Sequence, residues 1–222
     1  MYGHRLLAFS QAGNRRRIFF PADILLFTDS PSLENVKKQV YIKHQGWPNA
    51  TLMRYHLFLS EQAWLAKYDH IFYLDIDMIV VGKVGDEILA DGITATIHAS
   101  YARVPKSFWT PEENIRSTAC LSKDEIRKYY TGCFIGGKRS HFATMCETLA
   151  RCIDIDNEIG FIATWHDESH LNRYLYDHPP ALELGDDFNA WYRTATTKIG
   201  RVNKALDGKV WANRPEVNGI QP

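Results

Sequence analysis

Short apolar runs alternate with longer amphipathic stretches along the chain. Apolar runs that end at turn-forming residues, and one stretch in which apolar and polar residues alternate, are typical of strands. They predict strands over residues 23–28, 40–44, 71–75, 93–97, 130–137 and 181–184. Ile71–Asp75 is the strongest buried-strand signal among them.

Three stretches between these runs have the pattern of helices. From Thr51 to Lys67 apolar residues recur at steps of three and four, which predicts an amphipathic helix. Two further helices are predicted over residues 140–154 and 168–176, and the prolines that follow stop the second. Strands separated by helices predict a layered α/β fold, in which ligands bind beyond the carboxyl ends of the strands. The polar segment 100–128 lacks periodicity and is long for a connection, so we expect a functional loop.

Two aspartates follow the strongest strand, in Leu74-Asp75-Ile76-Asp77. Residues two apart in a strand point to the same side, so the two carboxylates emerge together. Like charges side by side are costly unless a cation neutralises them. A hard, oxygen-preferring ion such as Mn²⁺ or Mg²⁺, carrying a diphosphate, fits this pair. The plain alternative is a solvated turn that contains two acids. The position of the pair directly after a hydrophobic strand favours a functional site.

A second Asp-x-Asp pair, Asp154 and Asp156, serves as a comparison. It lies at the end of a helical pattern, where residues two apart do not face together. We expect this pair to be a solvated helix end.

The run Trp165-His166-Asp167-Glu168-Ser169-His170 is dense in ionisable groups. Acids at the start of a helix are favoured by its dipole, so a capped helix is the plain interpretation. That interpretation does not account for the tryptophan and the two histidines. His166 and His170 also approach the His-Glu-x-x-His pattern of zinc hydrolases, with Asp167 in the place of the glutamate and no evident third ligand.

Composition and charge narrow the class of protein. The 222 residues carry 26 basic and 26 acidic side chains, a formal net charge of zero. This balance argues against a nucleic-acid binder and a polybasic membrane-surface protein. No apolar run approaches the length of a membrane span, and the start is too short in apolar residues for a signal peptide. The 4 cysteines form no Cys-x-x-Cys pair, so we expect free thiols in a reducing, cytoplasmic setting.

Two motifs resemble those of glycosyltransferase family 6, which contains the histo-blood-group A and B transferases and α-1,3-galactosyltransferase. They are Tyr129-Tyr-Thr-Gly-Cys-Phe-Ile-Gly-Gly137 and Ala163-Thr-Trp-His-Asp-Glu-Ser-His-Leu-Asn-Arg-Tyr174, with Asp-x-Asp upstream. The resemblance runs from about Asp23 to about Leu184.

The resemblance implies a GT-A-type, Rossmann-like fold with a mixed sheet flanked by helices, formed by residues 1–222 as a single domain. It implies retaining transfer of galactose or N-acetylgalactosamine from a UDP-sugar to a glycan acceptor ending in galactose, in α-1,3 linkage. The family's first strand has no convincing match before His4, so we expect that strand to be incomplete.

The resemblance also assigns site residues. Glu168 matches the catalytic nucleophile or oxocarbenium stabiliser, and Asp75 and Asp77 match the residues that hold Mn²⁺ and the donor. Both acids are retained here, which places the chain with the metal-dependent members. The remaining donor contacts are Arg54, Asp167 and the small residues Thr131, Gly132 and Cys133. The acceptor contacts are His98, Thr110 and Trp165.

These residue types suit the chemistry. Departure of UDP builds negative charge that a metal and basic groups neutralise, and an ionised Glu168 meets the positive charge at the sugar carbon. We expect His166 or Arg173 to assist. Cys133 is larger than the glycine that would leave room for an N-acetyl group, which favours galactose as the donor sugar.

Some positions depart from the family pattern. Glu112-Glu113-Asn114 lacks the arginines of the family's Glu-Arg-Arg segment, and the tail after Leu184 resembles the family little. Lys198, Arg201 and Lys204 are candidates for the basic groups that close over the diphosphate in relatives, with a solvated basic helix as the plain alternative.

Two other functions fit parts of the pattern. A haloacid-dehalogenase-like phosphatase would use Asp75 as nucleophile and the acids that follow Leu184, but it leaves the run from Trp165 to His170 without a role. A UDP-sugar-binding relative without turnover is the non-enzymatic alternative, and the presence of Glu168 argues against it.

Overall fold

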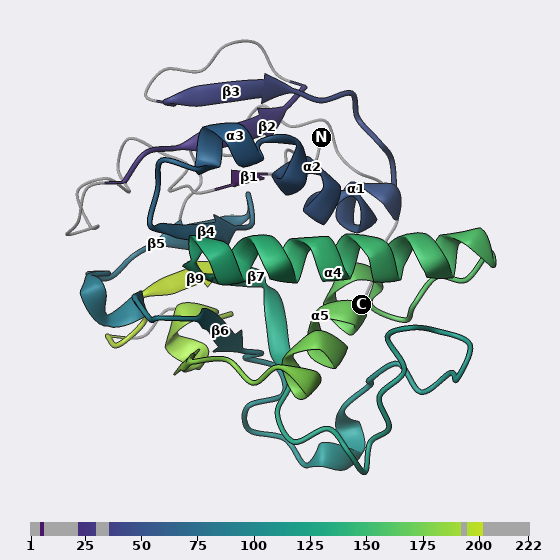
Figure 1. The fold of residues 1–222 in the computed structure, drawn as a ribbon. Coiled ribbons are helices and arrows are strands. Elements are labelled where there is room, and N and C mark those ends of the chain that lie inside the picture. The colour runs from purple at the N-terminus through teal and green to yellow at the C-terminus, as the bar shows by residue number, and fades with distance from the viewer. Residues whose placement is uncertain (1–4, 7–21, 30–35, 192–194, 202–222) are drawn as a thin grey trace.

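A mixed sheet organises the part of the chain that the structure, a computed structural model, describes: residues 5–6, 22–29, 36–191 and 195–201 (Figure 1). Its strand order is β3-β2-β1-β4-β7-β6-β8. The strands are β1 (Arg5–Leu6), β2 (Leu25–Thr28), β3 (Lys38–Tyr41), β4 (His70–Leu74), β6 (Ile93–Ile97), β7 (Tyr130–Lys138) and β8 (Leu182–Leu184). A second, two-stranded sheet pairs β5 (Met78–Val80) with β9 (Ile199–Arg201).

The directions of the strands define one functional edge of the main sheet. β7 is antiparallel to both β4 and β6, and β6 is parallel to β8. The carboxyl ends of β4, β6 and β8 therefore meet the beginning of β7 along the same edge. The sequence motifs after residues 74 and 97 and around residue 131 all lie at this edge.

Helices cover the sheet and carry part of the site. They are α1 (Asn49–Leu52), α2 (Arg54–Ser60), α3 (Gln62–Leu65), α4 (Arg139–Glu158) and α5 (His166–Asp177), with short 3-10 turns η2 (Asp86–Ile88), η3 (Lys106–Phe108) and η4 (Asp186–Phe188). The long α4 crosses the sheet, and α5 lies beside it (Figure 1). The mixed α/β class expected from the sequence is confirmed.

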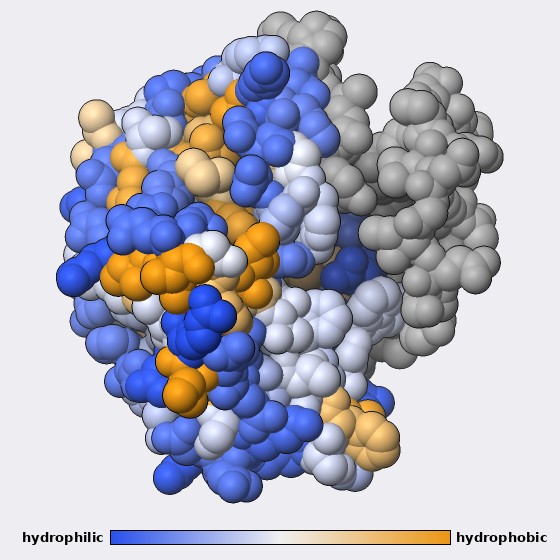
Figure 2. Space-filling model, turned by 90° about the vertical axis from the view of Figure 1, so that its right-hand side faces the viewer, coloured by the Kyte–Doolittle hydropathy of each residue, from blue (hydrophilic) through white to orange (hydrophobic). Residues whose placement is uncertain are grey.

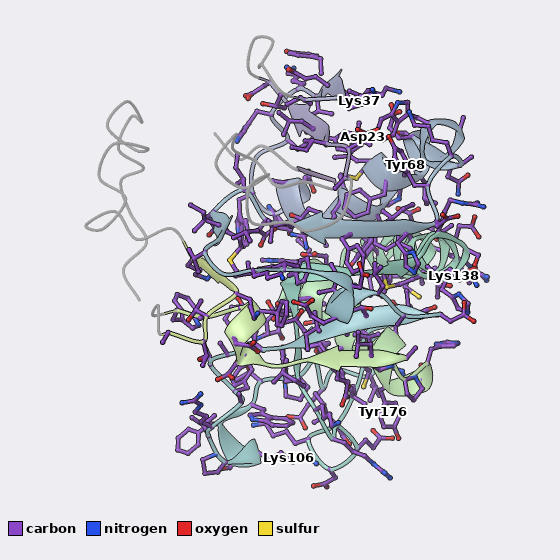
Figure 3. All side chains as sticks on the ribbon, turned by 90° about the vertical axis from the view of Figure 1, so that its left-hand side faces the viewer. Asp23, Lys37, Tyr68, Lys106, Lys138 and Tyr176 are labelled. Atoms are coloured by element: carbon purple, nitrogen blue, oxygen red, sulfur yellow. The ribbon has the colours of Figure 1, made fainter. Side chains whose placement is uncertain are left out.

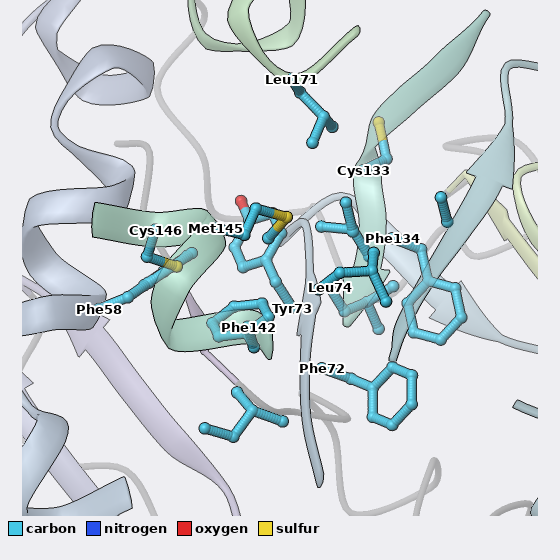
Figure 4. Close-up of a cluster of buried hydrophobic side chains, with 14 of the residues drawn as sticks. Phe58, Phe72, Tyr73, Leu74, Cys133, Phe134, Phe142, Met145, Cys146 and Leu171 are labelled. Atoms are coloured by element: carbon cyan, nitrogen blue, oxygen red, sulfur yellow. The ribbon is translucent and has the colours of Figure 1, made fainter. Parts of the chain in front are cut away.

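The main core lies between the sheet, α2 and α4. Phe58 contacts Tyr73 and Phe142 with ring centroids 5.4 and 5.7 Å apart, and Met145 and Leu171 close the cluster from α4 and α5 (Figure 4). All five side chains are buried. At about 1.5–3 kcal/mol for each fully buried large apolar side chain, this cluster is a main source of fold stability.

The segment 98–129 has a small core of its own. Leu121, Ile126 and Tyr129 are buried together, and Tyr101 and Trp109 pack against them. This segment forms the lower part of the molecule in Figure 1, and Lys106 lies there in Figure 3. The sequence predicted a long segment without regular periodicity, and the structure shows a packed unit that stands beside the functional edge.

Two predicted elements differ clearly from the observed ones, and two short strands were not predicted. The helix predicted over residues 51–67 is interrupted at Met53 and Glu61, where ψ is close to zero, and so forms α1, α2 and α3. Interruptions of one residue leave the apolar spacing intact, so periodicity cannot report them. The strand predicted at 40–44 begins at Lys38 and ends at Tyr41. β5 and β9 were not predicted, because three residues offer too little pattern.

The prediction for the second Asp-x-Asp pair was wrong for Asp156. Asp154 is exposed and contacts His56, but Asp156 is buried inside α4, which continues to Glu158. Its carboxylate accepts hydrogen bonds from Ser117 Oγ at 2.5 Å and from the backbone N–H of Thr118 at 2.8 Å. A local pattern cannot show that a distant loop folds over this side of the helix.

Contacts outside the core hold the first strands in place. The hydroxyl of Tyr68 donates to Asp23 at 2.8 Å, a pair that Figure 3 shows near the top of the molecule.

The four cysteines are free, and Cys133 and Cys146 are buried. The face in Figure 2 carries separate hydrophobic patches among polar side chains. Within the described ranges, none of the helices combines the length and the apolar character needed to cross a membrane.

Candidate active site

A cavity of about 420 Å³ opens at the functional edge of the main sheet. Elements far apart in the sequence contribute to it: the turn before α1, the ends of β4 and β6, the beginning of β7, the first turn of α5, and β9. The lining residues are Trp47, Thr51, Arg54, Asp75, His98, Ser100, Tyr101, Gly132, Cys133, Trp165, His166, Asp167, Glu168, Trp191 and Arg201.

Arg54 is the buried cation at the floor of this cavity. Its Nη1 donates to the carbonyl of Gly132 at 2.8 Å and lies 3.0 Å from Asp167 Oδ2, and its Nη2 lies 3.3 Å from Asp75 Oδ1. Burial disfavours the charge of Arg54, but the neighbouring Asp167, then Tyr73 and Asp75, raise its pKa well above the usual value. Arg54 therefore stays charged and holds the acids of both motifs together.

Glu168 is one of the acids that line the cavity. Oε2 accepts the backbone N–H of Gly132 at 2.8 Å, and Oε1 lies 3.8 Å from His98 Nε2. Burial raises the pKa of Glu168 to about 7 against the opposing hydrogen bond from Gly132, and burial lowers the pKa of His98 to about 4. His98 is thus neutral beside Glu168, and the glutamate changes its charge near neutral pH.

Gly132 makes this arrangement sterically possible. A Cβ at this position would lie 3.1 Å from Arg54 Nη1 and 3.7 Å from Glu168 Oε2. The absence of a side chain lets the guanidinium and the carboxylate approach the backbone of β7 from two sides.

The first turn of α5 orients the second motif. His166 has φ of 49°, a left-handed conformation that costs a non-glycine residue roughly 1–2 kcal/mol. Its ring packs against the edge of Trp47, with centroids 4.3 Å apart. The turn places Asp167 and Glu168 at the helix N-terminus, where the helix dipole favours negative charge.

The Asp-x-Asp pair lies at the end of β4 with both carboxylates engaged. Asp75 accepts from the hydroxyl of Tyr73 and contacts Arg54, and Asp77 Oδ2 accepts from Arg201 Nη1 at 2.9 Å. In the described ranges no three His, Cys, Asp or Glu side chains form a metal-binding group. Two carboxylates nevertheless fit the way Mg²⁺-like ions bind, through one or two carboxylates with phosphates and water completing the shell.

The opposite wall is aromatic. Trp165 is 47% exposed, and its Nε1 donates to Thr110 Oγ1 at 2.7 Å. The hydroxyl of Tyr101 also lies 2.7 Å from Thr110 Oγ1, and its ring packs beside His98. The residues expected to contact the acceptor therefore form one connected surface, anchored by the segment 98–129.

Several expectations differ from this geometry. Arg173 lies outside the lining and pairs with Asp177, so it does not assist Glu168, whereas His166 does line the cavity. Thr131 is fully buried, accepts the N–H of Cys133 and does not reach the cavity surface. Lys204 lies outside the described residues. Trp47, Tyr101 and Trp191 were not foreseen, and their only sequence signal is that they are aromatic residues outside the predicted strands.

His166 and His170 do not form the zinc pair considered above. His166 faces Trp47 in the cavity, whereas the buried His170 lies 3.6 Å from Asp156 and 3.3 Å from Thr118 Oγ1. Glu112 has a comparable structural role, because its carboxylate accepts the N–H of Thr164 at 2.8 Å just before Trp165.

The pKa of Glu168 predicts how activity depends on pH. If ionised Glu168 is needed, kcat/KM, which reports the free enzyme, should level off above pH 7 and fall about tenfold between pH 7 and pH 6. Below pH 6 it should fall more steeply, because Asp167, whose pKa burial raises to about 6, then also takes up a proton. Initial rates between pH 5.5 and 8.5 measure this, with the affinity for the substrate over the same range as the control. A flat profile would contradict the assignment.

The comparisons with known proteins agree with the motifs. A family model described as Glycosyltransferase family 6 matches residues 33–206, which extends beyond Leu184, the end expected from the motifs. The chain is 30% identical over 174 residues to "Histo-blood group ABO system transferase 1" of Rattus norvegicus, covering 73% of this chain and 50% of that protein. It is 32% identical over 178 residues to "Globoside alpha-1,3-N-acetylgalactosaminyltransferase 1" of Gallus gallus, with the same coverage.

A bacterial protein is also similar. The chain is 27% identical over 171 residues to "O-antigen biosynthesis glycosyltransferase WbnI" of Escherichia coli, covering 77% of this chain and 71% of that protein. The chain spans about half the length of the two animal relatives. The extent of the family match and the motifs around the cavity show that this chain belongs to glycosyltransferase family 6.

Proposed function

We propose that this chain is a retaining hexosyltransferase of GT-A type. It moves galactose or N-acetylgalactosamine from a UDP-sugar to a glycan ending in galactose, in α-1,3 linkage. The observation that carries the proposal is the carboxylate of Glu168, which is 19% exposed and lines a cavity together with Asp75, the first acid of the Asp-x-Asp pair, and Trp165. The name of one animal relative, an α-1,3-N-acetylgalactosaminyltransferase, supports N-acetylgalactosamine and the α-1,3 linkage.

Some residues of the site stabilise charge during the reaction, and others position the acceptor. Arg54 and Arg201 bring positive charge to the side of the cavity where Asp75 and Asp77 lie, and there they stabilise the departing diphosphate. Glu168, ionised and held by the N–H of Gly132, stabilises or attacks the sugar carbon as the bond to UDP breaks. The indole of Trp165 packs on the acceptor, and His98, neutral beside Glu168, contacts its hydroxyl groups.

Mn²⁺ or Mg²⁺ fits the oxygen ligands of Asp75 and Asp77. When bound, the ion supplies charge neutralisation of the diphosphate. Arg201 and Arg54 already neutralise part of the charge of these carboxylates, so binding of a cation at Asp77 involves a rearrangement of its contact with Arg201.

Cys133 favours galactose as the donor sugar. Its side chain is buried at the cavity wall, with Sγ 3.4 Å from Arg201 Nη2, and Gly132 beside it carries no side chain. A sulfur at this position leaves less room for an N-acetyl group than a glycine would.

A panel of donors and acceptors tests the proposed function. UDP-galactose, UDP-N-acetylgalactosamine and UDP-glucose are each incubated with Mn²⁺ and either lactose or fucosylated lactose, and products are read by mass spectrometry. We expect transfer of galactose to the galactoside, exceeding that of N-acetylgalactosamine. Hydrolysis of a generic phosphate ester instead would favour the phosphatase, and UDP binding without transfer would favour the relative without turnover.

The Asp-x-Asp assignment gives a binding prediction. Asp77→Asn should weaken UDP binding in the presence of Mn²⁺ about tenfold or more, since one anionic ligand of the ion is lost. Calorimetry of UDP binding with and without Mn²⁺ measures this for both proteins, with Asp124→Asn, an exposed acid of the segment 98–129, as the matched control. Equal UDP affinity with and without metal in the wild type would contradict the assignment of the Asp-x-Asp pair as the metal site.

A further inference from the structure

A buried tyrosine lies behind the first acid of the Asp-x-Asp pair. Tyr73, on β4, is 1% exposed, and its ring belongs to the core cluster of Figure 4. Its hydroxyl donates to Asp75 Oδ1. Residues two apart in an extended chain point to the same side, which is why a phenol at position 73 reaches the carboxylate at position 75. Tyr73 thus holds Asp75 from the interior, while Asp75 lines the cavity.

Arg54 reinforces this contact. Its Nη2 lies 3.3 Å from the same oxygen, Asp75 Oδ1, and its guanidinium lies over the ring of Tyr73, 4.3 Å from the ring centroid. A cation over the face of an aromatic ring is attracted to it, which keeps the guanidinium in place. Tyr73 therefore acts on Asp75 twice, directly through its hydroxyl and indirectly through Arg54.

These contacts decide which oxygen of Asp75 a ligand can reach. The backbone N–H of Asp75 donates to the carbonyl of Cys133 at 2.9 Å, which fixes the main chain against β7. Within the described residues, both hydrogen bonds to the carboxylate are made to Oδ1. The side chain is 24% exposed, and Oδ2 is the oxygen left for a ligand in the cavity. Asp75 is thus presented as a ligand with one oxygen.

The second acid of the pair is held less firmly. Asp77 is 40% exposed and contacts Arg201 of β9, which is itself 29% exposed. Ion pairs at such exposure contribute little to stability, so Asp77 can turn to meet another cation. The fixed orientation of Asp75 is therefore the feature of the pair that can select among cations.

The chemistry of divalent cations gives this orientation a consequence. Mg²⁺ keeps a near-octahedral shell of 6 ligands and is bound through one or two carboxylates, and Mn²⁺ also prefers an octahedral oxygen shell. Ca²⁺ takes about 6–8 oxygens and often uses both oxygens of a carboxylate. A carboxylate with one oxygen already occupied suits the first two ions and offers less to Ca²⁺.

We infer that Tyr73 is a positioning residue that presents Asp75 to the cation through Oδ2 alone and thereby favours Mn²⁺ or Mg²⁺ over Ca²⁺. Tyr73 acts through Asp75 and Arg54 and is not itself a ligand. The inference rests on the proposed function, in which Asp75 and Asp77 hold a divalent cation together with the diphosphate.

Tyr73→Phe tests this role, because it removes the hydroxyl and keeps the ring that packs on Phe58 and lies under Arg54. Calorimetry measures UDP binding with Mn²⁺, with Ca²⁺ and with EDTA. In the wild type we expect tighter binding with Mn²⁺ than with Ca²⁺. In the variant the ratio of these affinities should fall about tenfold, the scale of a hydrogen bond to a charged group, and the affinity in EDTA should stay the same.

Tyr55→Phe is the matched control. Tyr55, on α2, is also 1% exposed, and within the described residues its hydroxyl has no hydrogen-bond partner. Its loss should leave the ratio at the wild-type value, and thermal unfolding of both variants checks that they are folded. In an Asp75→Asn protein, adding Tyr73→Phe should not change the ratio further, because the group through which Tyr73 acts is already altered.

The outcomes are distinct. A ratio that falls in Tyr73→Phe and not in Tyr55→Phe supports the inference. Equal affinities with Mn²⁺ and Ca²⁺ in the wild type, or a ratio that Tyr73→Phe leaves unchanged, overturn the inference and leave the proposed function standing. UDP affinity in the wild type that is the same with Mn²⁺, Ca²⁺ and EDTA overturns the inference together with the proposed metal site.

Discussion

Glu168→Gln should reduce sugar transfer by about a thousandfold or more, the scale on which loss of a charge-stabilising or nucleophilic group acts. The amide has the shape of the carboxylate and still accepts the N–H of Gly132, but it carries no charge to meet the positive sugar carbon. UDP affinity should stay close to that of the wild type, because Glu168 is not among the residues proposed to hold the diphosphate.

Transfer rates and UDP calorimetry on the same preparations test this result. Glu158→Gln, a matched change at an exposed glutamate at the end of α4, should leave both unchanged. Transfer at the wild-type rate in Glu168→Gln would exclude Glu168 as the catalytic group.

Arg54→Met should destabilise the protein by about 3–5 kcal/mol, the cost of removing one partner from a buried ion pair. Arg54 and Asp167 each have side chains that are 6% exposed, so the variant leaves a buried carboxylate without its guanidinium. Chemical denaturation measures the loss, and adding Asp167→Asn to the same protein should recover part of it, because the uncompensated charge is then gone.

Arg173→Met is the matched control. Arg173 pairs with Asp177 on α5, where both side chains are about one third exposed, and its Nη1 donates to the carbonyl of Cys120 at 3.1 Å. Its loss should therefore cost only about 1–2 kcal/mol. Equal destabilisation by the two arginine variants would contradict the role given to Arg54 as the buried cation that holds the site together.

The sequence predicted the parts of the site that depend on local pattern. Asp75 and Asp77 follow an apolar strand, and Asp167 and Glu168 begin a helix, and the structure places both pairs at the same edge of the sheet. Strand and helix periodicity fix the ends of elements well enough to locate such motifs. Their resemblance to a known family supplied the roles.

The local pattern of apolar and polar residues could not predict contacts between distant segments. Nothing local indicates that Arg54 would lie buried between Asp75 and Asp167, or that Asp156 would hold the loop at Ser117. The pairing of β5 with β9, which brings Arg201 to Asp77, joins two three-residue strands more than a hundred positions apart. Such pairings are decided by packing and by burial of charge in the whole fold.

The stereochemistry of the product tests the central claim most directly. Transfer from UDP-galactose to lactose, followed by proton NMR of the product, shows whether the new bond keeps the α configuration of the donor. We predict an α-1,3-linked galactose on the terminal galactose, together with release of UDP. A β-linked product, or release of free galactose without any new glycosidic bond, would contradict a retaining transferase that works through Glu168.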